Sequence, residues 1–117
     1  LKHSVAANEE MHYPRNTFAE TVDYIVQLLD EAAPALEWKA SDTDAGRMTK
    51  AGAMALKLRV LLFAASPTFN SATPYHTKAD VYSCYGNYDR ERWGKAVEAG
   101  KAFFDELDKN RQYELVP

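Results

Sequence analysis

The sequence lacks several features, and each absence excludes a class of protein. It has one cysteine, Cys84, which excludes an internal disulfide. It has no excess of positive charge: the net charge is -3 and the basic residues are scattered, which argues against a nucleic-acid partner. It has no apolar run that could span a membrane, because the longest one predicts a helix of roughly 16 residues with three cations inside it.

Metal-binding patterns are present only in part. Glu9 and His12 have the spacing of a carboxylate-bridged metal motif, but such a site needs a second copy on a facing helix, and the sequence has none. The acidic stretch 42–46 is similar to part of a calcium loop, but its glycine falls one place early. Ala53 also stands where the bidentate glutamate should be. We therefore expect a solvated pair at the first position and a turn at the second.

No catalytic constellation is present. Cys84 lacks the nearby histidine and base that would activate a nucleophile. His76 is expected to be a surface residue rather than a ligand. We therefore expect that the protein is not an enzyme and that it binds no metal and no cofactor.

The chain has the composition of a globular protein, with 46% hydrophobic and 26% charged residues, and its 117 residues allow one domain at most. It begins at Leu1 without a methionine, and it ends at Pro117 directly after the start of a predicted extended segment. We therefore expect residues 1–117 to be a single segment of a larger helical domain.

A long apolar stretch organises the chain. Thr49 is a good N-cap, because its hydroxyl can accept a hydrogen bond from the first turn, and Pro67 cannot continue a helix. Together they predict a helix over 50–65. Its apolar residues form two stripes: Ala51, Ala55, Leu58, Leu62 and Ala65, and then Ala53, Leu56, Val60 and Phe63. Such a helix is expected to be buried on most sides, so that a charge at Leu58 or Leu62 should unfold the chain.

An amphipathic helix is predicted before the central one. Thr17 and Glu20 have the spacing of a capping box, in which the hydroxyl and the carboxylate each accept from the other residue's N–H. Pro34 marks the end of this helix, which should cover about 17–33. Its apolar stripe is Phe18, Val22, Ile25, Leu29 and Ala32.

A third amphipathic helix is predicted over about 90–109, with Asp89 as its cap and Asn110 as its C-cap. Its apolar stripe is Trp93, Ala96, Val97, Gly100, Phe103, Phe104 and Leu107. Paired helices with small residues facing large ones are used in tetratricopeptide-type arrays. The predicted fold is therefore mostly α, with tetratricopeptide-like helix pairs in a segment of an α-α superhelix with long loops.

Two long connections join the predicted helices. Residues 34–48 are rich in turn-forming residues, and Trp38 is expected to pin them to the core. Residues 68–88 form a connection that is unusually long for a compact domain, and loops of this length are often functional.

The second connection carries the candidate ligand-binding residues. Sugar rings present apolar C–H faces that stack on aromatic rings, and their hydroxyls bond to amides and carboxylates. The candidates are Tyr75, Tyr82, Tyr85, Asn87 and Tyr88. In the alternative interpretation, the tyrosines only pin the loop onto the helices, with their hydroxyls at the surface. The sequence leaves both interpretations open.

Residues 46–70 resemble the hallmark of the SusD/RagB family. That pattern has Gly-Arg, a small-residue helix opened by Thr-Lys, and Ala-Leu-Lys-x-Arg-Val-x-Leu-aromatic-Ala-Ala-Ser-Pro, followed by a bulky residue, Phe and Asn. Its most specific part is matched here by Ala64-Ala65-Ser66-Pro67-Thr68-Phe69-Asn70. Residues 28–34 resemble the end of the preceding family helix, and residues 93–101 and 113–115 resemble the elements that follow.

The resemblance implies a protein of the outer membrane of Bacteroidetes-type bacteria. Family members are surface-exposed, lipid-anchored nutrient-binding proteins that bind glycans and cap a TonB-dependent SusC-like transporter, and they are not enzymes. The implied role of this segment is a scaffold, with the lipid anchor and the main ligand contacts outside it. Cys84 is internal and does not match the lipid-carrying cysteine of the family.

A different class of function also fits the helical pattern: a stand-alone tetratricopeptide-like module that binds an intracellular peptide. The length and surroundings of the reading frame distinguish the two interpretations. An upstream lipobox and a neighbouring transporter gene would support nutrient binding, whereas a short cytosolic reading frame would support the interaction module.

Overall fold

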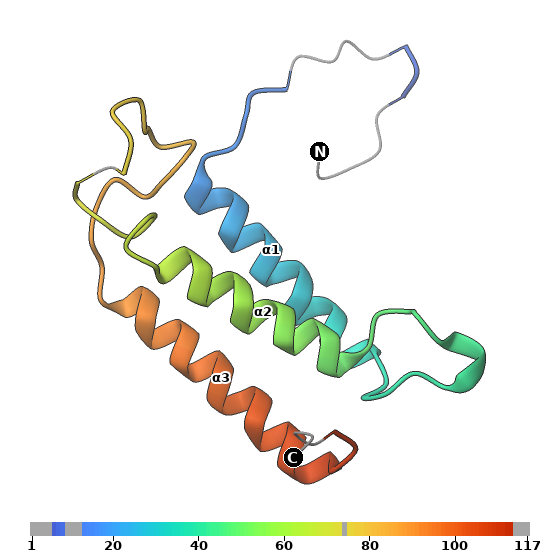
Figure 1. Cartoon of the computed structure of the whole chain (residues 1–117). Helices are drawn as coiled ribbons and strands as arrows, with labels where there is room; N and C mark the ends of the chain where they lie inside the picture. Colours follow the sequence, from blue (N-terminus) through green and yellow to red (C-terminus); the bar gives the residue numbers. More distant parts are fainter. Residues whose placement is uncertain (1–5, 9–12, 74, 114–117) are drawn as a thin grey trace.

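The computed structural model describes residues 6–8, 13–73 and 75–113 (Figure 1). These residues form three α-helices and two short 3-10 helices and contain no strand, which confirms the mostly α prediction. The elements are α1 (Phe18–Ala32), η1 (Ala33–Ala35), η2 (Asp42–Asp44), α2 (Lys50–Ala65) and α3 (Glu91–Asn110). The extended segment predicted after Tyr113 lies outside the described residues.

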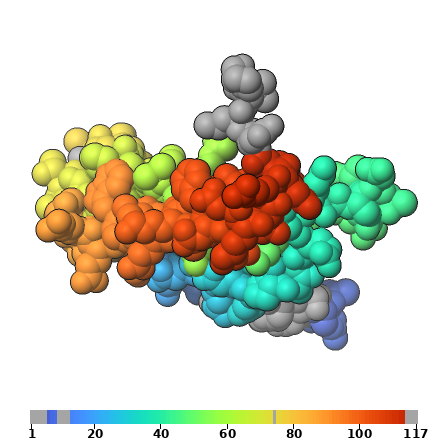
Figure 2. Space-filling model, turned by 90° about the horizontal axis from the view of Figure 1, so that it is seen from below, coloured from blue at the N-terminus to red at the C-terminus, as the bar shows by residue number. Residues whose placement is uncertain are grey.

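The three α-helices lie side by side, and α2 runs between α1 and α3 and antiparallel to both (Figure 1). α2 packs against both neighbours, whereas no backbone packing joins α1 to α3 in the part of the chain that is described. The connection of residues 34–48 projects at one end of the helices, and the connection after α2 lies at the other end (Figures 1 and 2). The described helices therefore form a single layer.

The predicted N-caps of α1 and α2 are confirmed. The Thr17 hydroxyl oxygen accepts from the Glu20 N–H at 3.2 Å, and the Glu20 carboxylate accepts from the Thr17 N–H at 2.8 Å, which completes the capping box. The Thr49 hydroxyl oxygen accepts from the Gly52 N–H at 3.1 Å. These local hydrogen bonds place the starts of two helices where the sequence predicts them.

The helix ends differ from the predictions in small ways. Pro34 does not terminate a helix outright, because it lies in the 3-10 turn that extends α1. Asn110 is the last residue of α3 and not its C-cap. Its side-chain amide donates to the Glu106 carbonyl at 2.7 Å, and Arg111 takes the left-handed conformation, with a φ of 46°, that closes the helix.

Asp89 caps the start of α3 as predicted, but it does so from outside the N-cap position. Arg90 occupies the N-cap position and makes no side-chain cap. The Asp89 carboxylate accepts instead from the Glu91 N–H at 2.8 Å. The cap therefore lies one residue before the N-cap position, where its negative charge still favours the helix N-terminus.

Small residues occupy most of the buried positions of the helices. No large side chain among the described residues is fully buried. The buried hydrophobic residues of the helices are Val22, Ala51, Ala53, Ala64, Ala65 and Ala96. Leu58 of α2 covers Gly100 of α3, where an added β-carbon would lie 3.4 Å from the Leu58 Cδ1. The helices are therefore held by close backbone approach more than by bulky side chains.

The prediction that α2 is buried on most sides is wrong. Leu62 is 49% exposed and Phe63 is 60% exposed. The middle helix of a single layer has neighbours on two sides only, so its other two sides are open (Figure 1). A charge at Leu62 is therefore not expected to unfold the layer, while Leu58, which contacts α3, keeps that prediction.

Trp38 packs as predicted. It is buried, and its ring centroid lies 6.3 Å from that of Phe103 and 6.2 Å from that of Tyr113. The Lys50 N–H also donates to the Glu37 carbonyl at 2.8 Å. These contacts hold the start of the connection against α2 and the end of α3. No helix in the described ranges is long and apolar enough to cross a membrane.

Ion pairs join α2 to both neighbours. The Lys57 ammonium lies 2.6 Å from the Asp30 carboxylate of α1, and the Lys50 ammonium lies 2.6 Å from the Glu106 carboxylate of α3. Lys109 also reaches Glu106, at 2.9 Å. Hydrogen bonds from Lys50 and then Lys109 lower the pKa of Glu106 to about 2.

Because Glu106 forms ion pairs with Lys50 and Lys109, we expect the fold to lose stability in acid. Because the folded-state pKa is about 2 and the ordinary value is 4.5, the pairs stabilise the fold fully above pH 4.5, and that stabilisation is lost as the pH falls toward 2. Glu106→Gln should reduce the drop in thermal midpoint between about pH 6 and pH 3. Glu98→Gln, on the same helix, is the control. An equal acid drop in the Glu106→Gln protein and the unmodified one would contradict this assignment.

Candidate functional site

The connection between α2 and α3 is closed by a cluster that we call the Asn70 latch, made of Asn70, Asp89 and Arg92. Asn70 is 2% exposed. Its amide nitrogen donates to the Asp89 carbonyl at 2.9 Å, and its amide oxygen accepts from the Asp89 N–H at 2.8 Å. The same oxygen accepts from Arg92 at 2.6 Å. One buried side chain thus joins the two ends of a long loop.

The residues before Asn70 turn the chain toward the latch. Ser66 has extended backbone geometry, as expected for a residue that precedes a proline. Its carbonyl then accepts from the N–H groups of Phe69 and Asn70, at 3.0 and 2.9 Å. This turn directs the Asn70 side chain back under the end of α2, where its amide also reaches the Ala65 carbonyl at 3.4 Å. The Ser-Pro-Thr-Phe-Asn sequence therefore has a structural role.

Phe69 lies at the centre of an aromatic cluster at this end of the layer. Its ring stacks on that of Phe18, with centroids 4.8 Å apart, and lies 4.6 Å from the ring of Phe63. Tyr85 meets Phe18 edge-on at 5.0 Å, and Tyr75 meets Phe69 edge-on at 6.2 Å. The cluster thus draws rings from α1, from α2 and from both ends of the loop into one contact network.

Two of the five candidate ligand-binding residues, Tyr85 and Asn87, contact Arg92 of α3. The Arg92 guanidinium lies over the Tyr85 ring, 3.7 Å from its centroid. The same guanidinium donates to the carbonyl and to the side-chain oxygen of Asn87, each at 2.9 Å. Burial raises the pKa of Tyr85, and the nearby Arg92 charge lowers it to a smaller extent. Tyr85 and Asn87 are therefore positioned by Arg92 and support the latch.

The other three candidates lie at the surface. Tyr75 is 58% exposed, Tyr82 is 41% exposed and Tyr88 is 61% exposed. Arg15 donates to the Tyr82 carbonyl at 3.2 Å, and its guanidinium lies 5.4 Å from the centre of the Tyr82 ring. No ring contact within the described ranges joins these three tyrosines to one another. They are separate exposed rings on one pinned loop.

The remaining loop residues singled out in the sequence have local structural roles. Cys84 is buried, and its thiol lies 3.5 Å from the Asp80 carbonyl. His76 accepts from the Lys78 N–H at 3.0 Å through its Nδ1 atom. Neither side chain belongs to a group of three metal-ligating residues, and no such group occurs among the described residues. Glu9 and His12 lie outside them.

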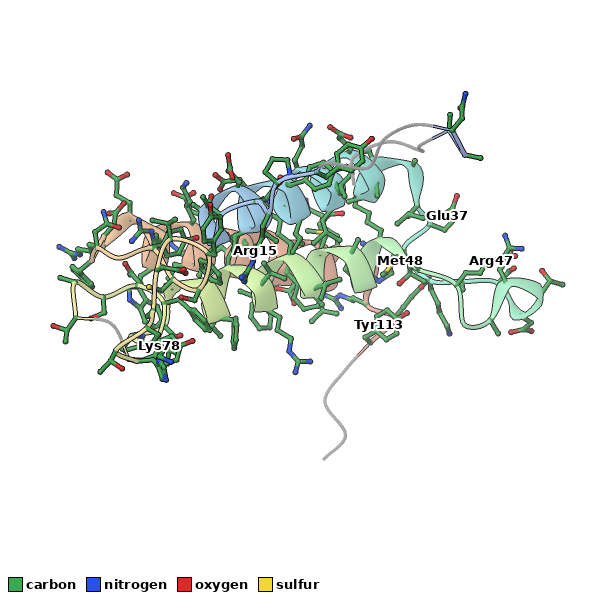
Figure 3. All side chains as sticks on the ribbon, turned by 90° about the horizontal axis from the view of Figure 1, so that it is seen from above. Arg15, Glu37, Arg47, Met48, Lys78 and Tyr113 are labelled. Atoms are coloured by element: carbon green, nitrogen blue, oxygen red, sulfur yellow. The ribbon has the colours of Figure 1, made fainter. Side chains whose placement is uncertain are left out.

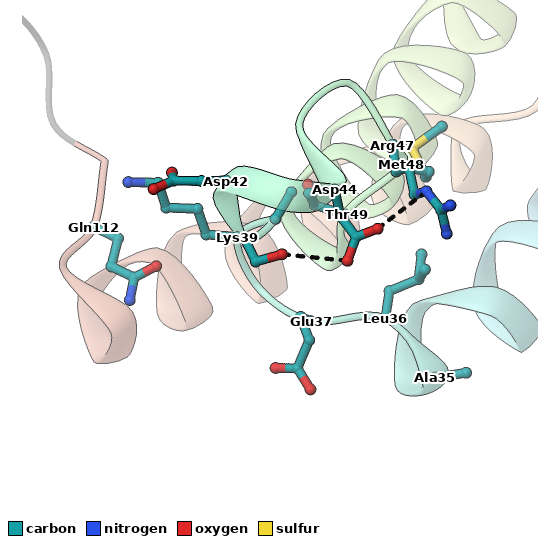
Figure 4. A pocket seen from close by; sticks show the side chains of 12 residues that line it. Ala35, Leu36, Glu37, Lys39, Asp42, Asp44, Arg47, Met48, Thr49 and Gln112 are labelled. Atoms are coloured by element: carbon teal, nitrogen blue, oxygen red, sulfur yellow. Dashed lines mark hydrogen bonds and ion pairs between the residues drawn. The ribbon is translucent and has the colours of Figure 1, made fainter.

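A polar hollow that the sequence did not indicate lies against the connection of residues 34–48 (Figure 4). Its volume is about 610 Å³. The charged residues that line it include Glu37, Lys39, Asp42, Asp44 and Arg47. The Asp44 carboxylate is already used, because Arg47 lies 3.2 Å from it and the Ser41 hydroxyl donates to it at 3.2 Å. These pairings close a local turn and leave that carboxylate less available to a ligand.

Figure 3 shows how the labelled side chains divide between the ends of the molecule. Glu37, Arg47 and Met48 lie at the end with the polar hollow, whereas Lys78 lies at the end with the aromatic loop (Figure 3). Candidate ligand contacts and the polar hollow are therefore separated by the length of the helices.

Among known proteins, this chain is similar to solved structures. No family model matches the chain, and no curated protein does. A solved structure of BT4246, a Bacteroides thetaiotaomicron protein, matches with a TM-score of 0.73 and 28% sequence identity over 95% of this chain. A selenomethionine form of BT4246 matches with a TM-score of 0.74 and 30% identity over 90% of this chain. The chain spans only 21% and 19% of these two structures.

Removal of the Asn70 side chain should weaken the fold. In Asn70→Ala, the Asp89 backbone groups and Arg92 lose partners in a place that water reaches poorly. We expect a loss of about 2–4 kcal/mol in the free energy of unfolding, measured by urea denaturation. Asn110→Ala removes an exposed amide with one hydrogen bond and is the control, with an expected loss of about 1 kcal/mol or less. Equal losses in the two variants would rule out the latch.

Proposed function

We propose that this chain is a scaffold segment of a SusD/RagB-type, cell-surface protein that binds a glycan or another nutrient and passes it to a TonB-dependent SusC-like transporter. In this proposal the whole protein is attached to the outer membrane through a lipid anchor outside the described segment. The segment itself is not an enzyme and needs no cofactor.

The observation that carries the proposal is the geometry of the loop between α2 and α3. The Asn70 latch closes the loop at its base, and the loop presents exposed rings from Tyr75, Tyr82 and Tyr88. A loop that is already ordered loses little conformational entropy when it binds, so exposed rings on it are suited to ligand contact. Tyrosine supplies both an apolar face for a sugar ring and a hydroxyl for its polar edge.

The similarity to BT4246 supports only the scaffold part of the proposal. It covers nearly the whole chain at 28–30% identity, and it is a similarity to part of a protein about five times as long. A segment that forms a fifth of such a protein fits a scaffold role better than that of a complete binding module. The transporter and the anchor come from the resemblance of residues 46–70 to the SusD/RagB pattern.

The central helix α2 contributes to this function as a support. Its ends are fixed by Thr49 and by the turn at Pro67, and its ion pairs join it to both neighbours. Its own side chains form no group that could perform chemistry. Its contribution is to hold the loop residues at a fixed place relative to α1 and α3.

The ligand is tested on the full-length polypeptide that contains this sequence, first by a glycan array and then by calorimetry with the best oligosaccharide. Tyr82→Ala should weaken binding about fivefold, because one stacked ring contributes about 1 kcal/mol. Its thermal midpoint should change little, because the Arg15 guanidinium lies 5.4 Å from this ring whereas Arg92 lies 3.7 Å from that of Tyr85. Tyr82→Phe keeps the ring and is the matched control. Tyr85→Ala should instead lower the midpoint, because Arg92 loses the ring that it covers.

Unchanged affinity in the separate Tyr75→Ala, Tyr82→Ala and Tyr88→Ala proteins would exclude this loop from ligand binding. Absence of any bound glycan across the array would contradict a glycan as the ligand in the proposed function.

A further inference from the structure

A small cavity lies between the two outer helices, next to the Asn70 latch. Its volume is about 220 Å³. α1 supplies Asp23 to its lining, α3 supplies Arg92 and Lys95, and the loop supplies Tyr85. Because no backbone packing joins α1 to α3 in the described part of the chain, the space between these two helices lies over α2 (Figure 1). The cavity thus brings side chains from separate segments to one place.

Three hydrogen-bonding groups that line the cavity are unused within the described residues. The Asp23 carboxylate and the Lys95 ammonium form no hydrogen bond or ion pair there, and the Tyr85 hydroxyl donates to no acceptor there. Burial raises the pKa of Tyr85, the Arg92 charge lowers it, and the Asp23 charge raises it, so Asp23 lies near that hydroxyl. An acceptor and two donors are therefore available at one cavity.

The other two charged groups of the cavity are held in place by the protein. The Arg92 guanidinium donates to Asn70 and Asn87, and the Asp89 carboxylate accepts from the Glu91 N–H. Two carboxylates and two cations therefore line the cavity, and the lining carries no net charge. A rigid, electrically balanced lining suits a ligand that is polar and uncharged.

The cavity also has an apolar part. Val22 of α1 and Ala64 of α2 line it and are 7% and 3% exposed. Leu61 of α2 lies one turn before Ala64 and lines it as well. A ligand that fits this cavity therefore needs an apolar surface together with several hydrogen-bonding groups.

We propose that this cavity binds one uncharged sugar residue of the nutrient. Each hydroxyl of a sugar ring can both donate and accept, so hydroxyls of one ring can bond to a carboxylate and to an ammonium at once. In the bound state, sugar hydroxyls donate to Asp23 and accept from Lys95 and from the Tyr85 hydroxyl. The C–H groups of the ring lie against Val22 and Ala64.

The charge of the lining distinguishes this ligand from charged ones. A uronic acid or a sulfated sugar would bring a negative charge to Asp23 and Asp89, and an amino sugar would bring a positive charge to Arg92 and Lys95. Like charges that are brought together oppose binding. A zwitterionic amino acid would pair with Asp23 and Lys95 but would leave the Tyr85 hydroxyl unused.

A second hollow continues from the cavity along the layer. Its volume is about 400 Å³, and Leu61 and Lys95 line both spaces. Glu98 of α3 also lines the second hollow, as does Lys57, which is paired with Asp30. The next residues of an oligosaccharide can therefore extend from the cavity without leaving the layer.

This proposal rests on the proposed function for the class of ligand, but it uses a different surface. The exposed loop residues Tyr75, Tyr82 and Tyr88 do not line the cavity. Variants of those tyrosines test the loop, and variants of Asp23 and Lys95 test the cavity. Either surface can therefore fail its test while the other passes.

The test is ligand-observed saturation-transfer NMR on the full-length polypeptide that contains this sequence. The probes are the uncharged methyl pyranosides of glucose, galactose and mannose, together with methyl glucuronide and L-alanine as charged probes. At least one of the three uncharged glycosides should bind. Asp23→Asn and Lys95→Met should each raise its dissociation constant about tenfold, because each variant removes a charged hydrogen-bonding partner.

Asp108→Asn and Lys101→Met are the matched controls. They make the same chemical changes at exposed positions of α3 that do not line the cavity. Neither should change the dissociation constant. Asp23 and Lys95 are themselves exposed and hold no described partner, so all four variants should keep the thermal midpoint of the unmodified protein.

Absence of binding by all three uncharged glycosides would overturn the proposal. Binding that both cavity variants leave unchanged would also overturn it, and the proposed function would then stand on the loop alone. Methyl glucuronide binding as tightly as the uncharged glycosides would contradict the argument from charge. Binding of L-alanine and of no glycoside would assign the cavity to a zwitterion instead.

Discussion

The organisation of this segment depends on one buried amide. Asn70 uses both the nitrogen and the oxygen of its side-chain amide, and its partners are Ala65 at the end of α2, Asp89 two residues before α3, and Arg92 in α3. Water cannot replace these partners easily at a site that is almost closed to solvent. The long loop is therefore fixed at its base, and the orientation of α3 relative to α2 is fixed with it.

The rest of the structure builds outward from that constraint. Arg92, oriented by Asn70, covers Tyr85 and binds Asn87, and so orders the second half of the loop. Phe69, next to Asn70, gathers rings from α1 and α2. The tyrosines that remain exposed are held on a rigid base, which is the physical reason to connect this loop with ligand binding.

Local sequence chemistry predicts where the helices begin and end, but it does not predict which of their side chains are buried. Thr17, Thr49 and Pro67 act on neighbouring backbone groups, so their effects are visible in the sequence, and the bounds 50–65 of the central helix are confirmed. The exposure of Leu62 and Phe63 was predicted wrongly, because periodicity shows that a side is apolar and not what covers it. The role of Arg92 could not be predicted, because it depends on a contact with Asn70 that only the fold creates.

The central claim is that the latch holds the loop closed, and amide hydrogen exchange in the unmodified full-length protein tests it most directly. The Asp89 N–H donates to the Asn70 side chain at 2.8 Å, and the Tyr85 N–H donates to the Phe69 carbonyl at 3.0 Å. Both amides should exchange at least about a hundredfold more slowly than in an unstructured peptide of the same sequence. Exchange of both at the rate of the unstructured peptide would contradict the claim.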